Sequence, residues 1–295
     1  MTREEINENL QDEIDLEEKK KNRKKIVINV IKVILLIIAL FILFFFVNKY
    51  INTGIIKVNE KRIINEKIPD SFNGIKIIQV SDIKYGSNIN NDDIKKLVKI
   101  INERKPDIVL YTGNLIDDQY KPNNKEMESI INNLKEIDAS LGKYAVYGDE
   151  DKEEFITIMN QSGFMILNNS RELIYNEGNT PINLVGLDIY SKSNLNEAFK
   201  DINSSYYSIV IANSDYYVDD LIKFKPNLVL VGGNHNGYVR LPVVGGLIKG
   251  EHKYTDPYYE KEGIKIYVSS GIGTDNIGIR FNNLPSINFF RISNK

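Results

Sequence analysis

A predominantly apolar run from Ile26 to Val47, IVINVIKVILLIIALFILFFFV, constrains the fold of this chain more than any other feature. An α-helix of that length spans roughly 30 Å of hydrocarbon. Its one charge, Lys32, lies within two turns of the start, where its ammonium reaches the headgroups. The run is too long for a signal peptide, lacks a small-residue cleavage site and is apolar on all sides, unlike a core helix. We expect one transmembrane anchor over residues 26–47.

Basic residues are concentrated before this run, where Lys19, Lys20, Lys21, Arg23, Lys24 and Lys25 lie close together. Those after it are sparse. The positive-inside rule therefore predicts a single-pass protein of the cell membrane with a cytoplasmic N-terminus and an extracytoplasmic main domain. Residues 1–25 combine acidic and basic stretches and are expected to form a cytoplasmic tail, solvated or briefly helical.

Composition narrows the partners and cofactors of the remaining chain. The formal net charge is -2, from 38 basic and 40 acidic residues, so no bulk field attracts nucleic acid and none is expected as a partner. The chain has no cysteine, which excludes disulfides and thiolate metal sites, and only two histidines, His235 and His252.

Strand-like and helix-like patterns alternate from residue 52 to residue 295. Short β-branched runs are separated by segments with apolar residues in helical phase, which is typical of an α/β domain with largely parallel core strands. We expect one such domain over 52–295. The predicted helices cover 94–101, 124–138 and 155–159, and the predicted strands cover 75–80, 107–111, 144–147, 163–167, 172–176, 182–187, 208–211, 228–231, 265–268 and 287–291.

Five loops follow predicted strands, at 81–86, 111–117, 147–151, 211–215 and 231–242. Their order and spacing resemble the motifs D-x-H, G-D, G-N-H-[DE], a lone His and G-H-T-H-G-G-Q-x-R-x-P of calcineurin-like metallophosphoesterases, especially the membrane-associated bacterial phosphodiesterase branch. The resemblance covers about residues 70–295. It implies an α/β/β/α sandwich with two mixed sheets, and a hydrolase with two divalent ions.

The chain departs from that family at most of its metal-binding positions. Matched to the motifs, the first aspartate is kept as Asp82, the bridging aspartate becomes Asn114, the amide ligand becomes Asp149 and the final histidine survives as His235. The other family histidines are substituted: the partner of the first aspartate by Lys84, the one near the leaving group by Glu150, and the remaining two ligands by Ala212 and Gly233. We assign Asp151, Tyr238 and Arg240 to the cleft, Tyr238 replacing the family glutamine.

These substitutions predict the loss of the metal centre. A hydrolytic divalent site usually needs three protein ligands and a water, and a neutral amide does not balance two cations as a bridging carboxylate does. An ammonium at Lys84 would repel an incoming metal ion. We expect Lys84 to take the place of the metal and to pair with Asp82, Asp149 or both. No cofactor is expected; an active protein would use Mn, Zn, Fe or Mg.

Ordinary structural roles remain open for the same residues. Asp82 would cap a turn, Lys84 would lie on the surface, and Asp149 to Asp151 would cap the helix that follows them. His235 would be a satisfied polar residue of a glycine-rich turn, and His252 would lie on the surface.

Three hypotheses of function follow from the sequence. The leading one is an inactive phosphoesterase-like domain that acts as an extracytoplasmic binding or scaffold module for an envelope polymer or a protein. The alternative is a residual metal-dependent phosphodiesterase that uses Asp82, Asp149, Glu150 and His235 after Lys84 swings out. The third is a purely structural part of a membrane complex.

Overall fold

The computed structural model describes residues 3–51, 55–189, 195–247, 252–274, 278 and 280–295. The chain divides into two compact units, Met1–Asn48 and Lys49–Lys295. Residue 52, where the sequence predicts that the outer domain begins, lies outside the described residues. The predicted domain boundaries therefore stay predictions.

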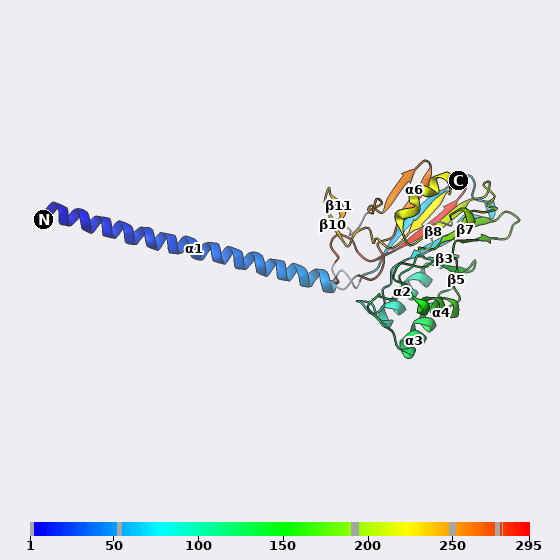
Figure 1. The fold of residues 1–295 in the computed structure, drawn as a ribbon, viewed down its shortest axis with the longest axis horizontal. Helices are drawn as coiled ribbons and strands as arrows, with labels where there is room; N and C mark the ends of the chain where they lie inside the picture. The colour runs from blue at the N-terminus through cyan, green and yellow to red at the C-terminus, as the bar shows by residue number, and fades with distance from the viewer. Residues whose placement is uncertain (1–2, 52–54, 190–194, 248–251, 275–277, 279) are drawn as a thin grey trace. The chain divides into compact units, whose positions relative to one another are not determined.

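The N-terminal unit is a helix, α1 (Arg3–Ile51), shown as one continuous coil in Figure 1. The apolar side chains described in its central part are exposed, for example Leu35, Ile37 and Phe41. By length and composition this helix can cross a membrane. The acidic residues from Glu4 onward belong to this same long helix, whereas the sequence predicted a solvated tail or a short frayed helix.

The first of two six-stranded sheets has the order β1-β14-β2-β3-β4-β5. Strands β2 to β5 are parallel, whereas β14 runs antiparallel to β2 and parallel to β1. The strands are β1 (Lys57–Ile64), β14 (Ser286–Ser293), β2 (Lys76–Val80), β3 (Ile108–Tyr111), β4 (Lys143–Ala145) and β5 (Met165–Ile166).

The second sheet has the order β12-β13-β9-β8-β7-β6. Its central strands are parallel, and its outermost strands β12 and β6 are antiparallel to their neighbours. The strands are β12 (Tyr258–Lys261), β13 (Ile264–Val268), β9 (Leu228–Val231), β8 (Ser208–Ala212), β7 (Ile182–Leu187) and β6 (Ser170–Ile174). A separate hairpin is formed by β10 (Val239–Leu241) and β11 (Gly245–Leu247).

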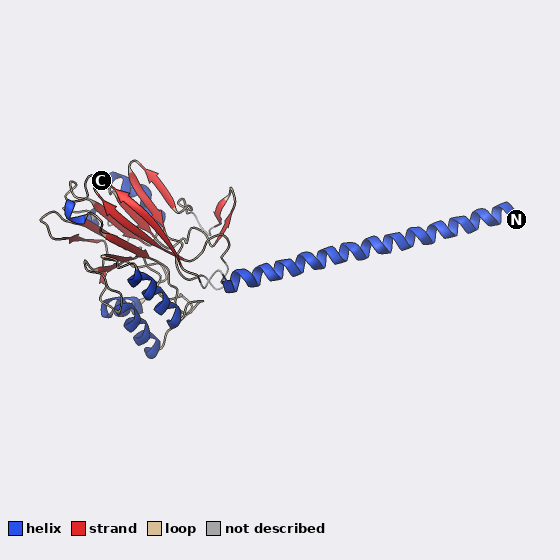
Figure 2. Ribbon diagram, turned by 180° about the vertical axis from the view of Figure 1, so that it is seen from behind, coloured by secondary structure: helices blue, strands red, loops and turns tan. Residues whose placement is uncertain are grey.

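Helices lie outside the strands, as Figure 2 shows in blue and red. Capping boxes at Asn90 and Asn123 begin the first two helices of the domain, where the side-chain oxygen accepts backbone N–H groups that lack helical partners. The helices are α2 (Asn91–Glu103), α3 (Asn124–Lys135), α4 (Glu153–Gln161), α5 (Leu195–Ala198) and α6 (Val218–Leu221), with 3₁₀ turns η1 (Asp70–Phe72), η2 (Asp215–Tyr217) and η3 (Ile222–Phe224).

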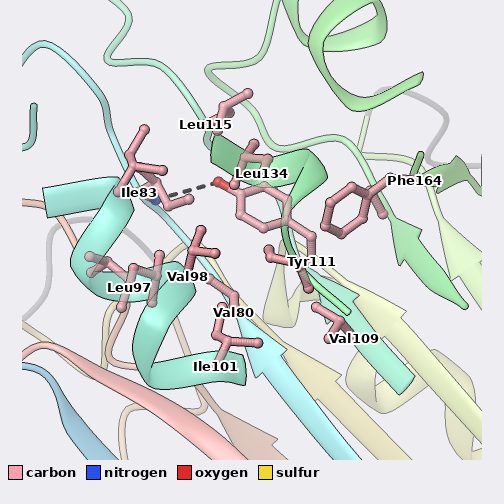
Figure 3. Packing of buried hydrophobic residues seen from close by; sticks show 14 of the residues in the cluster. Val80, Ile83, Leu97, Val98, Ile101, Val109, Tyr111, Leu115, Leu134 and Phe164 are labelled. Carbon is pink, nitrogen blue, oxygen red and sulfur yellow. Dashed lines mark hydrogen bonds between the residues drawn. The ribbon is translucent and has the colours of Figure 1, made fainter. Parts of the chain in front are cut away.

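Three buried apolar clusters define the layers. One lies between the first sheet and α2–α4; it contains Tyr111 of β3, whose ring lies beside that of Phe164, and Leu97, Val98 and Ile101 of α2 (Figure 3). A second joins the two sheets, and a third lies between the second sheet and α5 and α6. The predicted α/β/β/α sandwich with two mixed sheets, preceded by an apolar N-terminal helix, is confirmed.

The sequence analysis found the central strands and missed peripheral ones. Every predicted strand appears, although the one over 163–167 is only Met165–Ile166. The strands β1, β10, β11 and β12 were not predicted. The sequence of β1, KVNEKRII, has mostly exposed or half-exposed side chains, so it lacks an apolar alternation.

Candidate functional site

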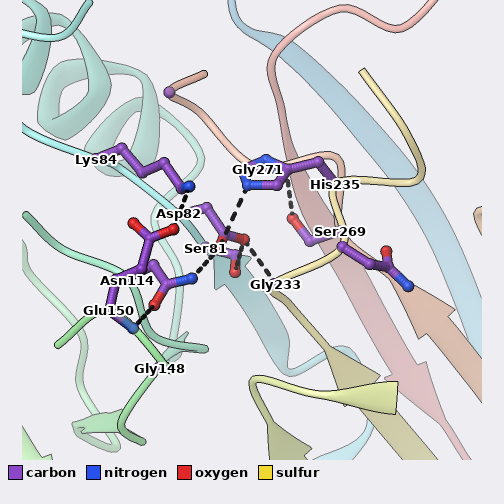
Figure 4. Close-up of polar contacts among 12 residues, drawn as sticks. Ser81, Asp82, Lys84, Asn114, Gly148, Glu150, Gly233, His235, Ser269 and Gly271 are labelled. Carbon is purple, nitrogen blue, oxygen red and sulfur yellow. Dashed lines mark hydrogen bonds and ion pairs between the residues drawn. The ribbon is translucent and has the colours of Figure 1, made fainter. Parts of the chain in front are cut away.

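The candidate residues meet where the two sheets present the C-terminal ends of their parallel strands. The loops after β2, β3 and β4 carry Asp82, Asn114 and Asp149, and the loop after β9 carries His235 (Figure 4). Backbone hydrogen bonds hold the loops against one another, for example from Asp82 N to Gly113 O at 2.9 Å. This is the edge at which α/β sheets usually place their ligand sites.

The backbone at this edge is left-handed at four of the candidate residues. The φ angles are 52° at Asp82, 49° at Lys84, 61° at Asn114 and 53° at His235. Asn, Asp and His tolerate this conformation better than other residues, whereas a lysine rarely adopts it. Such residues cluster at functional sites and cost on the order of 1–3 kcal/mol each, so the surrounding loops must hold them in place.

Asn114 lies between the two carboxylates that match the family's ligands. Its Nδ2 is 3.1 Å from Asp82 Oδ1 and 2.9 Å from Asp149 Oδ1. Its Oδ1 accepts a hydrogen bond from Glu150 N at 3.1 Å, which fixes the orientation of the amide. The centre of the site therefore receives two N–H donors from Asn114 and no lone pair.

Lys84 is buried, with 3% of its surface exposed, so the alternative of a surface lysine is wrong. Its Nζ lies 2.6 Å from Glu150 Oε1. The sequence predicted Asp82, Asp149 or both as partners of Lys84, and the structure shows a further partner, Glu150, that was not predicted. Desolvation raises the pKa of the nearby Asp82, and the Lys84 charge opposes this rise without overcoming it.

Burial dominates the electrostatics of the acidic groups. Desolvation raises the pKa of Asp82 from 3.8 to about 6, against the Ser81 hydroxyl bond and the Lys84 charge. Desolvation likewise raises the pKa of Glu150 from 4.5 to about 7, although the Lys84 hydrogen bond opposes it. The ion pair therefore compensates only part of the cost of burying these carboxylates.

His235 is buried, with one ring nitrogen satisfied and the other open. Its Nδ1 lies 3.2 Å from the carbonyl oxygen of Ser270, which assigns the proton to Nδ1. Its Nε2 has no hydrogen-bond partner among the described residues and lies 3.6 Å from Asp82 Oδ1. Burial, together with the charges of Arg280 and Lys84, holds the pKa of His235 well below 6.5, so the imidazole is neutral. The alternative of a fully satisfied turn histidine holds for only one of its nitrogens.

Asp151 organises the loops and does not cap a helix. Its carboxylate accepts hydrogen bonds from the backbone N–H groups of Asn114, Leu115 and Gly148, each at 2.8 Å. The residue that precedes α4 is Lys152, and no side chain caps that helix. The capping alternative is therefore not observed for Asp151, whose pKa desolvation raises to about 6.

Tyr238 and Arg240 of the last motif, at the base of the hairpin, make different contacts. The ring of Tyr238 lies 4.4 Å from that of His235, measured between centroids. Arg240 Nη1 donates to the carbonyl oxygens of Asn236 and Thr255, and its Nη2 lies 2.5 Å from Asp256 Oδ1. Arg240 thus fixes the hairpin to the neighbouring loop.

Two of the four positions at which the family has a histidine and this chain does not, Ala212 and Gly233, have no room for a histidine side chain. Ala212 packs in the apolar cluster beneath α5 and α6. Gly233 has a φ of 77°, and a Cβ there would lie 2.5 Å from the carbonyl oxygen of Asn213. A ligand at either position would require the backbone or the core to move.

Several residues of the site were missed by the sequence analysis. Asn213 donates from Nδ2 to Thr112 O at 2.7 Å, and the N–H of Gly233 donates to Asp82 Oδ2 at 3.0 Å. Arg280, fully buried, donates to the carbonyl oxygens of Gly271 and Gly273. Asn213 follows a strand end, which was an available signal, whereas arginine is so rarely buried that nothing pointed to Arg280.

His252 was also misplaced by the sequence analysis. It is largely covered, its Nδ1 lies 2.5 Å from Asp215 Oδ1, and its ring stacks on Tyr216. The hydrogen bond to Asp215 raises the pKa of His252 above 6.5. The pair therefore joins His252 to Asp215 in the loop after β8.

The residues of the site do not fit the two divalent ions of an active phosphoesterase. The Asn114 N–H groups and the Lys84 ammonium already compensate the carboxylates. Among the described residues, the group of three or more acidic or histidine donors close enough for one ion is Asp117, Asp118 and Glu150, beside the ancestral centre. Glu150 is the partner of Lys84, so a metal ion at this group would compete with the Lys84 ammonium for the Glu150 carboxylate.

Comparisons with known proteins bear on the family. No family model matches the chain. The uncharacterized metallophosphoesterase YkuE of Bacillus subtilis is 27% identical over 255 residues, which cover 83% of this chain and 88% of YkuE. YkoQ of the same organism, also named a metallophosphoesterase, is 24% identical over 82% of this chain and 92% of its own. A zebrafish (Danio rerio) transmembrane protein with a metallophosphoesterase domain is 24% identical over 76% of this chain and 54% of its own. With the fold and the five loops described above, the chain is similar over most of its length to proteins named metallophosphoesterases.

Proposed function

We propose that this protein is a membrane-anchored metallophosphoesterase-fold protein that has lost hydrolytic activity and serves as an extracytoplasmic binding or scaffold module. Its ligand would be an envelope polymer or another protein. One observation carries the proposal: the Asn114 amide nitrogen lies within hydrogen-bonding distance of both Asp82 and Asp149.

The charge arrangement supports the loss of metal. A divalent ion between Asp82 and Asp149 would meet two N–H dipoles with their positive ends toward it. It would also meet the buried Lys84 ammonium, and like charges a few ångströms apart repel by several kcal/mol at an effective dielectric constant of about 20. Binding would therefore require Asn114 and Lys84 to turn away, which breaks the Lys84–Glu150 pair.

The preserved scaffold supports a binding role. The loops keep their left-handed backbone at Asp82, Asn114 and His235, and Asp151 and Arg280 still hold them by buried hydrogen bonds. A centre maintained at such conformational cost, without the ligands for hydrolysis, is consistent with a surface that must keep its shape.

The orientation in the membrane is part of the proposal. The basic cluster before the apolar run favours a cytoplasmic N-terminus, which places the sandwich outside the cytoplasm. The relative from zebrafish that is named a transmembrane protein supports membrane attachment and leaves the side open.

One observation favours a residual hydrolase as the second candidate. The open Nε2 of His235 and Oδ1 of Asp82 are 3.6 Å apart, close to the separation of about 3.4 Å expected for two ligands at 2.1 Å from one tetrahedral ion. This pair alone provides two ligands, so a third would have to come from Asp149 after Asn114 turns away.

Metal content decides between the two candidates. The full chain, with its affinity tag removed, is placed in lipid nanodiscs, equilibrated with Mn²⁺ or Zn²⁺, and analysed by elemental mass spectrometry. We expect close to zero ions per chain and no hydrolysis of a chromogenic phosphodiester. The double variant Lys84→His, Asn114→Asp removes the ammonium and the amide donors, and it is expected to bind more metal than the wild type.

The opposite outcome would support the residual hydrolase. That outcome is one or two ions per wild-type chain, together with phosphodiester hydrolysis that Asp82→Ala abolishes. Asp82→Asn serves as a matched variant because it keeps the volume of the side chain and removes its charge.

A further inference from the structure

We propose that the β10–β11 hairpin, residues 239–247, inserts its apolar tip into the surface of the bilayer that holds the chain's own apolar helix. The inference rests on the membrane attachment proposed above and is independent of whether the domain hydrolyses phosphoesters.

The tip of the hairpin exposes aliphatic side chains together. Val243 is 108% exposed and Val244 is 69% exposed, and the paired strands add Leu241 at 38% and Leu247 at 49%. Single exposed aliphatic residues are ordinary, but neighbouring ones on a projecting turn indicate an interaction surface. Figure 1 shows β10 and β11 outside the two large sheets.

The backbone conformation at the tip of the hairpin is unfavourable for a valine, the residue at position 243. Val243 has a φ of 70°, a left-handed conformation that glycine or asparagine adopts with less strain and that a β-branched side chain opposes. The valine is fully exposed, so it gains nothing from packing within the domain. An apolar side chain here has a physical benefit only if something outside the domain covers it.

The base of the hairpin is held firmly, so the tip is presented in a defined way. Arg240 N donates to Phe281 O at 2.9 Å, and the Arg240 guanidinium binds the Thr255 carbonyl and the Asp256 carboxylate. At Gly237, just before β10, a Cβ would lie 2.8 Å from the backbone of Leu247, so this segment packs closely against the end of β11.

Connectivity identifies the bilayer as the occupant. Phe281 binds the hairpin, and Pro285 accepts a hydrogen bond from Lys57 N, the first residue of β1. The hairpin base and the point where the chain enters the sheet are therefore joined by a short segment, about 14 Å long when extended. About ten residues separate the apolar run from Lys57, which limits that tether to roughly 35 Å.

A tether of that length holds this end of the domain near the membrane surface, so its side chains have a high effective concentration at the bilayer. Aliphatic side chains gain free energy on entering the headgroup–acyl boundary in proportion to the area they bury. A lipid surface is thus the apolar phase that the chain itself keeps within reach of Val243 and Val244.

The chain has no tryptophan, so a single introduced one reports on its own surroundings. The full-length variants Val243→Trp and Val244→Trp are reconstituted in vesicles of phosphatidylcholine and phosphatidylglycerol, with and without brominated acyl chains. Tyr175→Trp is the matched control, because Tyr175 is 52% exposed and follows β6 at the opposite end of the second sheet. Phe41→Trp reports on the apolar helix.

We expect a blue-shifted emission and quenching on the order of twofold by brominated lipid for both tip variants and for Phe41→Trp, with neither change for Tyr175→Trp. Two tip positions are used because tryptophan at Val243 also alters a strained turn. Unquenched, water-like emission from both tip variants beside a quenched Phe41→Trp would overturn the hairpin proposal and leave the anchor intact.

Two other outcomes would also overturn the proposal. A blue shift at the tip without quenching by brominated lipid would mean that protein, such as a second copy of the chain, covers the hairpin. An unquenched Phe41→Trp would remove the membrane attachment itself, and the proposed function with it. The metal content of the protein, measured separately, still decides between an inactive module and a residual hydrolase whether or not the hairpin enters the bilayer.

Discussion

Replacing Asn114 by aspartate tests the proposed centre most directly. The substitution preserves shape and exchanges the Nδ2 donor for a carboxylate oxygen, 3.1 Å from Asp82 Oδ1 and 2.9 Å from Asp149 Oδ1. Two hydrogen bonds to ionised acceptors are lost, at roughly 1.5–3 kcal/mol each. Each new pair of charges 3 Å apart would add about 5 kcal/mol at an effective dielectric constant of 20.

Protonation limits this cost, because the cluster binds a proton before it tolerates three adjacent charges. The Lys84 ammonium offsets a further part. We expect Asn114→Asp to lower the free energy of unfolding by roughly 3–6 kcal/mol at pH 8 and by clearly less at pH 5, where the added carboxylate holds its proton.

The assay is urea unfolding of residues 49–295 with a chelator present, at both pH values. Asn90→Asp is the matched control, because Asn90 caps α2 by accepting from Asp92 N at 2.8 Å and aspartate caps a helix equally well. It should change the free energy of unfolding by no more than about 0.5 kcal/mol. Equal stability of Asn114→Asp and wild type at pH 8 would show that the amide does not lie between the two carboxylates.

Three further predictions concern charge. Lys84→Met removes the charge partner of the partly buried Glu150 and should cost about 3 kcal/mol at pH 8, but less at pH 5; an unchanged urea midpoint would contradict this ion pair. Because burial raises the pKa of Asp82 and Asp151 from 3.8 to about 6, the folded state binds protons more tightly. Each group should therefore lower the free energy of unfolding by roughly 3 kcal/mol as the pH rises from 4 to 7. If Asp82→Asn kept the full pH dependence of urea unfolding, Asp82 would not contribute to the loss of stability between pH 4 and pH 7. Proton NMR should show His252 titrating above pH 6.5 and His235 still neutral well below it; the reverse order would mean that the two environments are misassigned.

The central strands were predictable because burial on both faces leaves a signature in the sequence. Strands β3 and β9 are continuous apolar runs, and β8 is apolar after Ser208; every residue of the three is buried, which is typical of parallel strands between layers. Strand β1 is charged and lies at a sheet edge, and its partner β14 is more than 200 residues away. Nothing local in the sequence of β1 indicates that pairing.

The candidate site was predictable as a group of loops and not as a network of contacts. Parallel strands bring their C-terminal ends together, so Asp82, Asn114 and Asp149 were expected to be neighbours. Lys84 has a left-handed backbone and pairs with Glu150, a contact between two loops that lie 66 residues apart in the sequence. No sequence pattern specifies that conformation for a lysine, which is why the ion pair with Glu150 was missed.

The pairing of the first strand of the sandwich with the last has a consequence for how the protein is made. In the sheet order, β14 lies between β1 and β2, so neither strand has its neighbour on that side until residues 286–293 have been synthesised. A ribosome therefore releases nearly the whole domain while β1 and the edge of β2 are still unpaired, an arrangement that exposes strand edges to aggregation. The nascent chain, with its apolar helix emerging first, must keep those edges protected for the duration of translation. Sheet closure is then a late step that couples folding of the domain to completion of its C-terminal strand.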